Sequence, residues 1–224
     1  MSLWSSIAEI IASLAKGEGL SALFDRLRVP PERTVTFTIA VIALGAKIAK
    51  ADGQVTRNEV AAFREVFHIP PEEEANAARV YDLARQDVAG YEEYATRIRG
   101  LYGDDIAPLA DLLEGLFHIA LADGDYHHNE DAFLTRVAEL WGLPERDFHR
   151  MRARFVPDSD QDPFDVLGLS RDATPDQIRA AWRMAVRDSH PDRLAARGVP
   201  PEAVKLAEAR LIAINRAWER IGAG

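Results

Sequence analysis

The sequence predicts an all-α protein: a bundle built from a duplicated helical hairpin, followed by a small antiparallel helical hairpin. Three observations favour this fold class. Apolar residues recur at spacings of three and four over most of the chain, which is the period of an amphipathic helix. Five residues around a turn recur at one fixed offset of 71 positions. The chain then closes with two long helical patterns that are separated by a proline-containing turn.

The composition is that of an ordinary soluble globular protein with an acidic first part. Hydrophobic residues make up 47% and charged residues 28% of the 224 residues, which is enough apolar material for a sizeable core. The formal net charge is −9, but residues 163–224 carry a net +2 and the remainder carries −11. An acidic bulk argues against nucleic-acid binding, which requires cations to neutralise phosphates. The asymmetry suggests two domains with different partners.

The sequence predicts a cytoplasmic protein without a membrane-spanning helix. Cysteine is absent, so no disulfide can form. The N-terminus lacks the basic region of a secretory signal. The longest apolar run, at 35–46, has 12 residues, whereas a spanning helix needs roughly 20.

The first 19 residues predict an amphipathic helix. Its apolar residues follow helical spacing from Leu3 to Leu14, and glycines at 17 and 19 end the pattern. We expect this helix to pack on the main body of the protein. The alternative is peripheral contact with the inner face of a membrane. A membrane-surface helix usually has a basic polar face, and this segment offers only Lys16.

A repeated hairpin is the basis of the predicted first domain, residues 20–156. The repeated residues are Ala51, Asp52, Gly53, Asn58 and Glu59, which recur as Ala122, Asp123, Gly124, Asn129 and Glu130. Helical patterns are expected at about 32–51, 71–86 and 91–102. One hairpin used twice around a shared core explains the repeat, and we expect the two turns to meet as a pseudo-twofold pair.

Two interpretations of the repeated turns remain open. In the first, Asp-Gly bends the chain, and Glu59 completes a capping box with Thr56 at the start of the next helix. In the second, the turns converge on a divalent cation such as calcium, which prefers hard oxygen ligands. The candidate metal ligands are the carboxylates of Asp52, Glu59, Asp123, Asp125 and Glu130.

Histidines near the second turn extend the cation hypothesis to zinc. His127 and His128 could add nitrogen ligands, and a metallohydrolase could be built around them. Neither turn has the spacing of an EF-hand loop, and the sequence holds no nucleophile motif or phosphate loop. His118 lies on an apolar helix, where we expect a core histidine. We therefore expect no enzyme activity, and no cofactor other than this candidate cation.

A polar, acidic stretch at 157–161 has the composition of a linker, and we place the domain boundary there. The second domain is predicted to span 162–224. It begins with a short helix closed by Gly168. A longer helix starts at Thr174, which can form a capping box with Gln177.

This longer helix is expected to run to about Ser189 and to be followed by a loop that contains His190-Pro191-Asp192. Proline disfavours helical geometry in the residue before it, so the helix should stop near His190. Arg179, Arg183 and Arg187 follow i, i+4 spacing on the face opposite the apolar stripe. This row of arginines should therefore remain in water.

The last helix is expected to begin near Pro200-Pro201. Its apolar stripe faces that of the preceding helix, so the two form an antiparallel hairpin. Trp182 and Trp218 lie on the two facing stripes. We predict that both tryptophans are structural.

These residues resemble the J domain of the DnaJ family from Asp162 to about Ile221. The matched residues, in the right order and spacing, are Phe164, Val166, Leu167, Gly168, Ile178, Ala181, Trp182, Arg183, His190, Pro191, Asp192, Leu211, Ile214, Asn215, Ala217, Trp218 and Ile221. The segment 193–202 resembles the J domain of the DjlA group. That group has a TerB-like helical domain before its J domain, and the duplicated turns resemble TerB.

The resemblance implies a co-chaperone that docks on a DnaK-type heat-shock-seventy chaperone and stimulates its ATPase. His190 and Pro191 would shape the docking loop, and Asp192 would pair with a cation of the partner. The arginine row, Arg179, Arg183 and Arg187, would steer the encounter toward an acidic patch. Hydrolysis would occur in the partner, so this chain would not be an enzyme. The TerB-like domain would be a targeting or regulatory module.

Some positions depart from the family pattern. Met184 stands where many J domains have a basic residue, Asp188 where lysine is common, and Ser189 where an aromatic residue is common. DjlA-type proteins also carry an N-terminal membrane-spanning segment, which this sequence does not predict. The alternative function is a non-catalytic scaffold or stress-sensing protein that acts mainly through its acidic TerB-like domain, with or without a bound metal.

Overall fold

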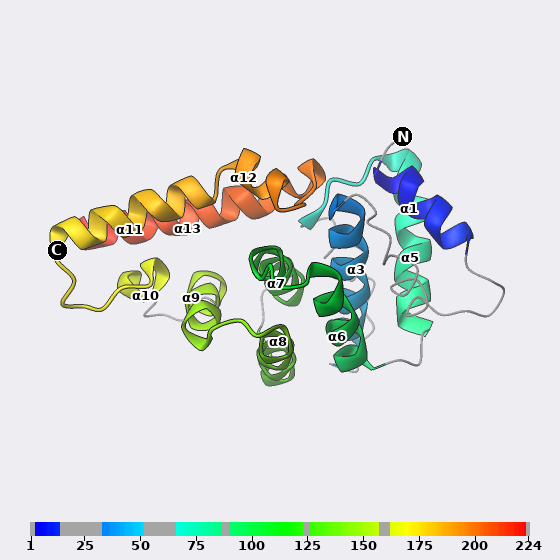
Figure 1. Cartoon of the computed structure of the whole chain (residues 1–224), viewed down its shortest axis with the longest axis horizontal. Helices are drawn as coiled ribbons and strands as arrows, with labels where there is room; N and C mark the ends of the chain where they lie inside the picture. The colour runs from blue at the N-terminus through cyan, green and yellow to red at the C-terminus, as the bar shows by residue number, and fades with distance from the viewer. Residues whose placement is uncertain are drawn as a thin grey trace.

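The computed structural model describes residues 3–13, 33–51, 66–86, 90–122, 126–156 and 162–222. All regular secondary structure in these residues is helical, which confirms the predicted all-α class. A bundle of helices occupies one side of the molecule, and a long two-helix hairpin extends from it (Figure 1). We call the described residues up to 156 the bundle, and residues 162–222 the J module.

The helices of the bundle agree with the sequence expectations. They are α1 (Leu3–Ala12), α3 (Arg33–Ala51), α5 (Glu74–Gln86), α6 (Tyr91–Tyr102), α7 (Ala107–Ala120), α8 (His128–Trp141) and α9 (Glu145–Phe155), with a 3₁₀ turn, η1 (Pro71–Glu73), before α5. The helical segments expected at 32–51, 71–86 and 91–102 are therefore confirmed to within one residue at each end. The first repeated turn lies outside the described residues, so the pseudo-twofold arrangement stays a prediction.

Helix α3 is the central helix of the bundle. It packs against α1, α5, α6, α7 and α8, and its residues 35–48 are all buried. The apolar run seen in the sequence is thus explained by burial on every side within the protein. No helix in the described part of the chain combines the length and the apolar character that crossing a bilayer requires.

Helices α3 and α7 approach closely at Gly115. A Cβ atom added to Gly115 would lie 3.4 Å from a methyl group of Val41 on α3 and 3.8 Å from a methyl group of Leu206 in the J module. A methyl group at position 115 would therefore just touch both neighbours, and a side chain longer than that of alanine would push against them. This glycine allows α7 to serve as the surface on which the bundle and the J module meet.

The N-terminal helix α1 packs on the bundle, as expected. Its apolar residues Trp4, Ile7 and Ile11 are buried against α3 and α5, and the Trp4 ring meets Phe67 edge-on at 6.3 Å. The face that a membrane contact would need is thus occupied by the protein's own core.

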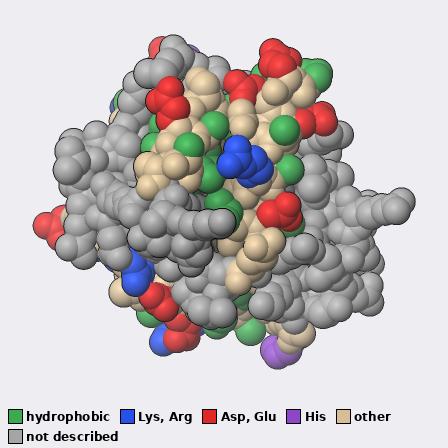
Figure 2. Space-filling model, turned by 90° about the vertical axis from the view of Figure 1, so that its right-hand side faces the viewer, with side chains coloured by type: hydrophobic (Ala, Val, Ile, Leu, Met, Phe, Trp, Pro, Cys, Tyr) green, Lys and Arg blue, Asp and Glu red, His purple; other side chains and the backbone are tan. Residues whose placement is uncertain are grey.

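On the face of the molecule shown in Figure 2, acidic side chains are scattered over the described residues.

The J module contains the three predicted helices and one that was not predicted. Its elements are α10 (Pro163–Leu167), α11 (Pro175–Asp188), α12 (Pro191–Ala196), the 3₁₀ turn η2 (Pro201–Ala203) and α13 (Val204–Gly222). The predicted capping box is confirmed, because Thr174 and Gln177 exchange side-chain to backbone hydrogen bonds of 3.3 and 2.8 Å. Gly168 closes α10 with a φ of 69°, in the left-handed region that glycine adopts readily.

The expectation of a simple loop at His190-Pro191-Asp192 was wrong in one respect. The segment does end α11, but it also starts the short helix α12. His190 is the residue before the first turn, and its Nδ1 accepts a hydrogen bond from the Asp192 N–H at 3.2 Å. Pro191 takes the first helical position, where its missing N–H is not needed. Proline therefore ends one helix and begins the next.

The outer part of the J module has a small core of its own. Val166, Leu167, Ile178, Ile214 and Ala217 are buried together there. The rings of Trp182 and Trp218 stack on this core with centroids 4.9 Å apart. The Trp182 Nε1 donates to the Asn215 Oδ1 at 3.0 Å, which ties α11 to α13. Both tryptophans thus lie between the two helices, on the faces expected from the sequence.

The inner part of the J module shares the core of the bundle. Leu194, Val199, Ala203, Leu206 and Ala207 are buried in one continuous cluster with residues of the bundle. The predicted linker at 157–161 lies outside the described residues. One apolar core therefore contains residues from both sides of the boundary that the sequence predicts.

Replacing Trp182 with alanine should destabilise the J module. The change removes the ring stack with Trp218 and the hydrogen bond to Asn215. Truncating a buried aromatic costs ~3–5 kcal/mol, and the partial exposure of Trp182 places the expected loss near the low end, at about 3 kcal/mol. Chemical denaturation followed by circular dichroism measures it. Trp182→Phe, which keeps a ring in the stack, should lose clearly less. Equal denaturation midpoints for Trp182→Ala and the wild-type protein would contradict this role.

Candidate functional site

The His190-Pro191-Asp192 segment, which we call the HPD turn, is presented to solvent. The side chains of His190 and Asp192 are 61% and 92% exposed. The His190 Nδ1 lies 3.6 Å from the Asp192 Oδ2, so the ring and the carboxylate are close but do not bury one another. Pro191 is exposed as well. The turn therefore has a defined backbone and freely accessible side chains, as a docking surface requires.

The arginine row of α11 is also exposed. Arg179, Arg183 and Arg187 all face solvent, as their spacing predicted. The ion pairs of two of these arginines are long: an Arg179 nitrogen lies 3.8 Å from an Asp176 oxygen, and an Arg187 nitrogen lies 3.9 Å from an Asp188 oxygen. Exposed pairs of this kind contribute little to stability. These cations therefore remain available to an acidic partner.

The candidate cation site is largely outside the described residues. Asp52, Glu59, Asp123 and Asp125 fall there, and only Glu130 can be placed. The Glu130 carboxylate is buried and accepts a hydrogen bond from the His127 N–H at 2.9 Å, at the start of α8. This contact is the helix-capping role of the first interpretation. No group of three or more potential metal-ligating side chains occurs within the described ranges. The cation hypothesis stays a prediction.

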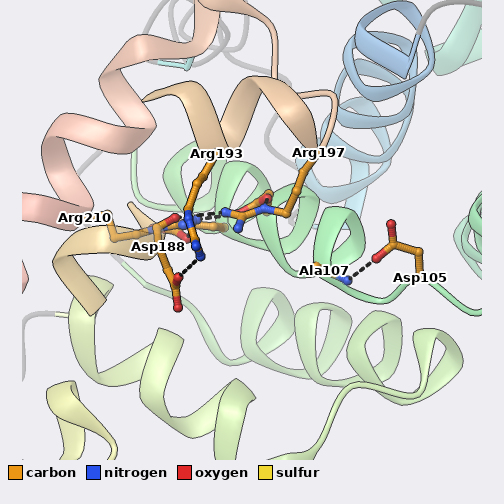
Figure 3. A network of polar contacts seen from close by, with 8 residues as sticks. Asp105, Ala107, Asp188, Arg193, Arg197 and Arg210 are labelled. Atoms are coloured by element: carbon orange, nitrogen blue, oxygen red, sulfur yellow. Dashed lines mark hydrogen bonds and ion pairs between the residues drawn. The ribbon is translucent and has the colours of Figure 1, made fainter. Parts of the chain in front are cut away.

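The structure also contains a charged cluster that the sequence analysis did not identify. Asp111 and Glu114 lie one turn apart on α7, and both are buried. Arg210 of α13 donates from Nε to the Glu114 Oε1 at 2.9 Å and from Nη2 to the Asp111 Oδ1 at 2.7 Å, and its Nη2 also pairs with the Glu114 Oε2. Arg197, which follows α12, donates from Nε to the Asp111 Oδ2 at 2.5 Å. Figure 3 shows the side chains of Arg197 and Arg210 pointing toward one another at this contact.

The electrostatics of the charged cluster favour its ionised state. Burial alone would raise the pKa of the Glu114 carboxyl, but the adjacent charges of Arg210 and Arg154 outweigh it and hold the pKa below its usual value. Burial likewise opposes the charged form of Arg210, whereas Glu114 and Asp111 raise the pKa of its guanidinium above its usual value. Glu114 and Arg210 therefore favour each other's charged forms in a place from which water is largely excluded.

Arg154 of α9 lies beside this cluster and has weaker polar contacts than Arg197 and Arg210. Its Nη1 lies 3.8 Å from the Glu114 Oε1, and its buried Nε has no hydrogen-bond partner among the described residues. Burial lowers the pKa of the Arg154 guanidinium to about 10, because Glu114 compensates only in part and Arg210 repels it. Glu114 thus balances two buried cations.

One signal in the sequence could have revealed the cluster. Helix α7 is apolar along most of its length, yet it carries Asp111 and Glu114 at i, i+3 spacing. Two carboxylates on one face of an otherwise buried helix need cationic partners. The identity of those partners could not be read from the sequence, because Arg197 and Arg210 lie 86 and 96 residues away from the carboxylates they bind.

The departures from the J-domain pattern lie on the side of the J module that faces the bundle. Met184 is 52% exposed and lines a groove of about 720 Å³ between the module and α9. Ser189 is buried, and its hydroxyl donates to the Ala185 carbonyl at 2.7 Å. Asp188 accepts a hydrogen bond from Arg193 Nη1 at 2.5 Å. The unusual residues are therefore those that meet the bundle or brace α12 beside it.

The fold and the site together define a class of protein in which a J-type hairpin is docked on an all-helical domain. The family model described as "Tellurite resistance protein TerB" matches residues 38–153, which is more than half of the chain. The matched residues lie within the predicted TerB-like domain. No solved structure matches this chain.

Relatives match the chain over both of its parts. A protein named co-chaperone protein DjlA from Photobacterium profundum is 29% identical over 85% of this chain and 78% of its own length. The protein of that name from Aliivibrio fischeri is 27% identical over 85% of this chain and 79% of its own length. The one from Coxiella burnetii is 29% identical over 78% and 72%, respectively. The chain therefore belongs to the TerB family and is a J-domain protein of the DjlA type.

Replacing Glu114 with glutamine should weaken the contact between the J module and the bundle. The change removes the carboxylate that balances Arg210 and Arg154 and leaves those cations buried. Breaking a buried pair in this way costs ~3–5 kcal/mol. Denaturation with urea should show a lower free energy of unfolding. Glu139→Gln is a suitable control, because it breaks an exposed pair with Arg136 and should change stability by less than about 1 kcal/mol. Similar losses in both variants would argue against the cluster.

The contribution of Glu114 should also depend on pH in one direction. Its pKa is lower in the folded protein than the ordinary value of 4.5, so the unfolded chain binds its proton more readily. The stabilisation is then fully present above the unfolded pKa and is lost as the pH falls through the folded pKa. The stability difference between wild type and Glu114→Gln should be constant above about pH 5 and should shrink at lower pH. A difference that grows on acidification would show the opposite shift.

Proposed function

We propose that this chain is a co-chaperone that docks its J module on a DnaK-type heat-shock-seventy chaperone and stimulates the chaperone's ATPase. The observation that carries the proposal is the exposed HPD turn between the two helices of a J-type hairpin. The relatives named co-chaperone protein DjlA, which match along both parts of the chain, support the same role. With such a partner, the protein acts in the cytoplasm.

The geometry of the HPD turn suits recognition rather than chemistry. His190 uses its Nδ1 to cap α12, so the side chain holds the backbone of the turn in place. The Asp192 carboxylate accepts no hydrogen bond from another side chain in the described structure and is free to meet a cation. We propose no catalytic group in this chain. The bond cleavage takes place in the partner, and this chain is an activator.

The exposed arginine row supplies the long-range attraction in this proposal. Arg179, Arg183 and Arg187 would face an acidic patch of the chaperone, which mainly raises the association rate and sets the register of docking. The bundle carries the opposite charge, with −11 outside residues 163–224. The acidic TerB-like domain would therefore not compete with the arginine row for the chaperone, and its own role would be targeting or regulation.

Substitutions in the HPD turn test the proposal. In a single-turnover ATPase assay with a DnaK-type chaperone, Asp192→Asn and His190→Gln should each abolish the stimulation seen with wild type. Asp192→Asn should leave helical content and melting unchanged, because its carboxylate is almost fully exposed. His190→Gln could lower stability slightly, since His190 caps α12, and a typical cap contributes ~1 kcal/mol.

A matched control separates this role from a general effect of charge. Asp176→Asn makes the same chemical change at another exposed aspartate of the J module, in the first turn of α11. It should leave stimulation close to the wild-type level. Undiminished stimulation by Asp192→Asn and His190→Gln would contradict docking through the HPD turn. A wild-type protein that does not stimulate any DnaK-type chaperone would favour the scaffold or stress-sensing alternative.

A further inference from the structure

Arg197 connects the HPD segment of the J module to the bundle. It follows the last residue of α12, the helix that the HPD turn begins. Its guanidinium donates from Nε to the Asp111 Oδ2 at 2.5 Å and from Nη2 to the Asp111 Oδ1 at 3.2 Å. The same Nη2 also donates to the Asp188 carbonyl at 3.2 Å, at the end of α11. One side chain at the end of α12 therefore binds both a carboxylate of the bundle and the end of α11 (Figure 3).

A second contact braces the other end of α12. Arg193, in its first turn, donates from Nη1 to the Asp188 Oδ1 at 2.5 Å. Asp188 is thus bound twice, through its carboxylate by Arg193 and through its carbonyl by Arg197. Only Ser189 and His190 separate Asp188 from Pro191. The direction in which α12 leaves the turn, and with it the placement of His190 and Asp192, depends on these two arginines.

We infer that Asp111 of the bundle is a positioning residue for the HPD turn and acts through Arg197. The inference rests on the proposed function, because it assigns the TerB-like domain a task in chaperone docking. Asp111 is buried, and the bidentate contact orients the planar guanidinium so that its Nη2 reaches the Asp188 carbonyl. The bundle thereby holds the turn in the arrangement in which it meets its partner.

The contacts of Glu114 separate this positioning role from the docking of the module as a whole. Without the Asp111 charge, Arg210 keeps both of its contacts with Glu114. The shared core around Leu206 and Gly115 also remains. Arg197 is 21% exposed and can take water in place of its lost partner. Removing the charge of Asp111 should therefore loosen α12 and leave the J module docked.

A looser turn should weaken the encounter with the chaperone without changing its outcome. If only a fraction of molecules holds the HPD turn correctly, the apparent affinity falls by that fraction. The maximal stimulation is the same once the chaperone is saturated. For Asp111→Asn we expect the half-saturating concentration of this protein to rise roughly threefold to tenfold at unchanged maximal stimulation. Partial unfolding would raise the half-saturating concentration in the same way. It would also speed hydrogen exchange throughout α7 and α13, which a change confined to the turn would not.

The experiment uses the full chain in four forms: wild type, Asp111→Asn, Arg197→Gln and the double variant. Asp131→Asn is the matched control, because it makes the same change at a carboxylate that binds an arginine Nε at 2.7 Å inside the bundle. Hydrogen exchange followed by mass spectrometry, without any chaperone, reports on the amides of residues 190–199. ATPase stimulation as a function of concentration gives the half-saturating concentration and the maximum.

The inference predicts faster exchange in residues 190–199 for both single variants, with unchanged exchange in α7 and α13. In the double variant, residues 190–199 should exchange no faster than in either single variant, because the two substitutions break the same interaction. The control should exchange like wild type. Unchanged exchange in Asp111→Asn, or faster exchange that extends over α7 and α13, would overturn the positioning role. If wild type itself fails to stimulate the chaperone, the proposed function fails, and the exchange data alone decide whether Asp111 holds the turn.

Discussion

The relation between the two parts of this protein depends on the pairing of Glu114 with Arg210. The two charges come from helices 96 residues apart in the chain, and both are buried. Moving an ion pair out of water costs desolvation energy, and the attraction between the two charges roughly offsets that cost. The pair therefore adds little net stability. It strongly disfavours every arrangement in which one charge would be buried alone. The pair therefore selects one register of the J module on α7.

This register explains why the J module behaves as two halves. Its inner half, around α12 and the start of α13, contributes Leu194, Val199 and Leu206 to the core of the bundle. Its outer half closes its own small core, covered by the stacked rings of Trp182 and Trp218. The HPD turn lies where α11 gives way to the inner half. A change in the bundle can therefore reach the turn through α12, whereas in the outer half α11 is held against α13 by contacts within the J module.

The sequence predicted local structure better than it predicted the contact between the parts. The start of α11 could be read from Thr174 and Gln177, and the buried α3 from an apolar run, because these signals lie within one segment. Helix α12 is not evident from the sequence, because a proline can end one helix and can equally occupy the first position of the next, as Pro191 does. The sequence around Arg197 and Arg210 does not indicate which carboxylates they bind. A guanidinium in water and one buried against a carboxylate look the same in a sequence, and only the fold distinguishes them.

The departures from the J-domain pattern follow from the same contact. A lysine at position 188 would add a cation beside Arg193 and close to Arg197, where Asp188 now accepts a hydrogen bond. A bulky aromatic side chain in place of Ser189 would have to fit where a buried hydroxyl now bonds the Ala185 carbonyl. Neither change alters Arg179, Arg183 or Asp192, which are exposed. Two departures from the family, at positions 188 and 189, thus lie beside the contact with the bundle, whereas the matched HPD turn and Arg183 face solvent. Selection for an internal partner and for an external one can act on separate sides of the same short hairpin.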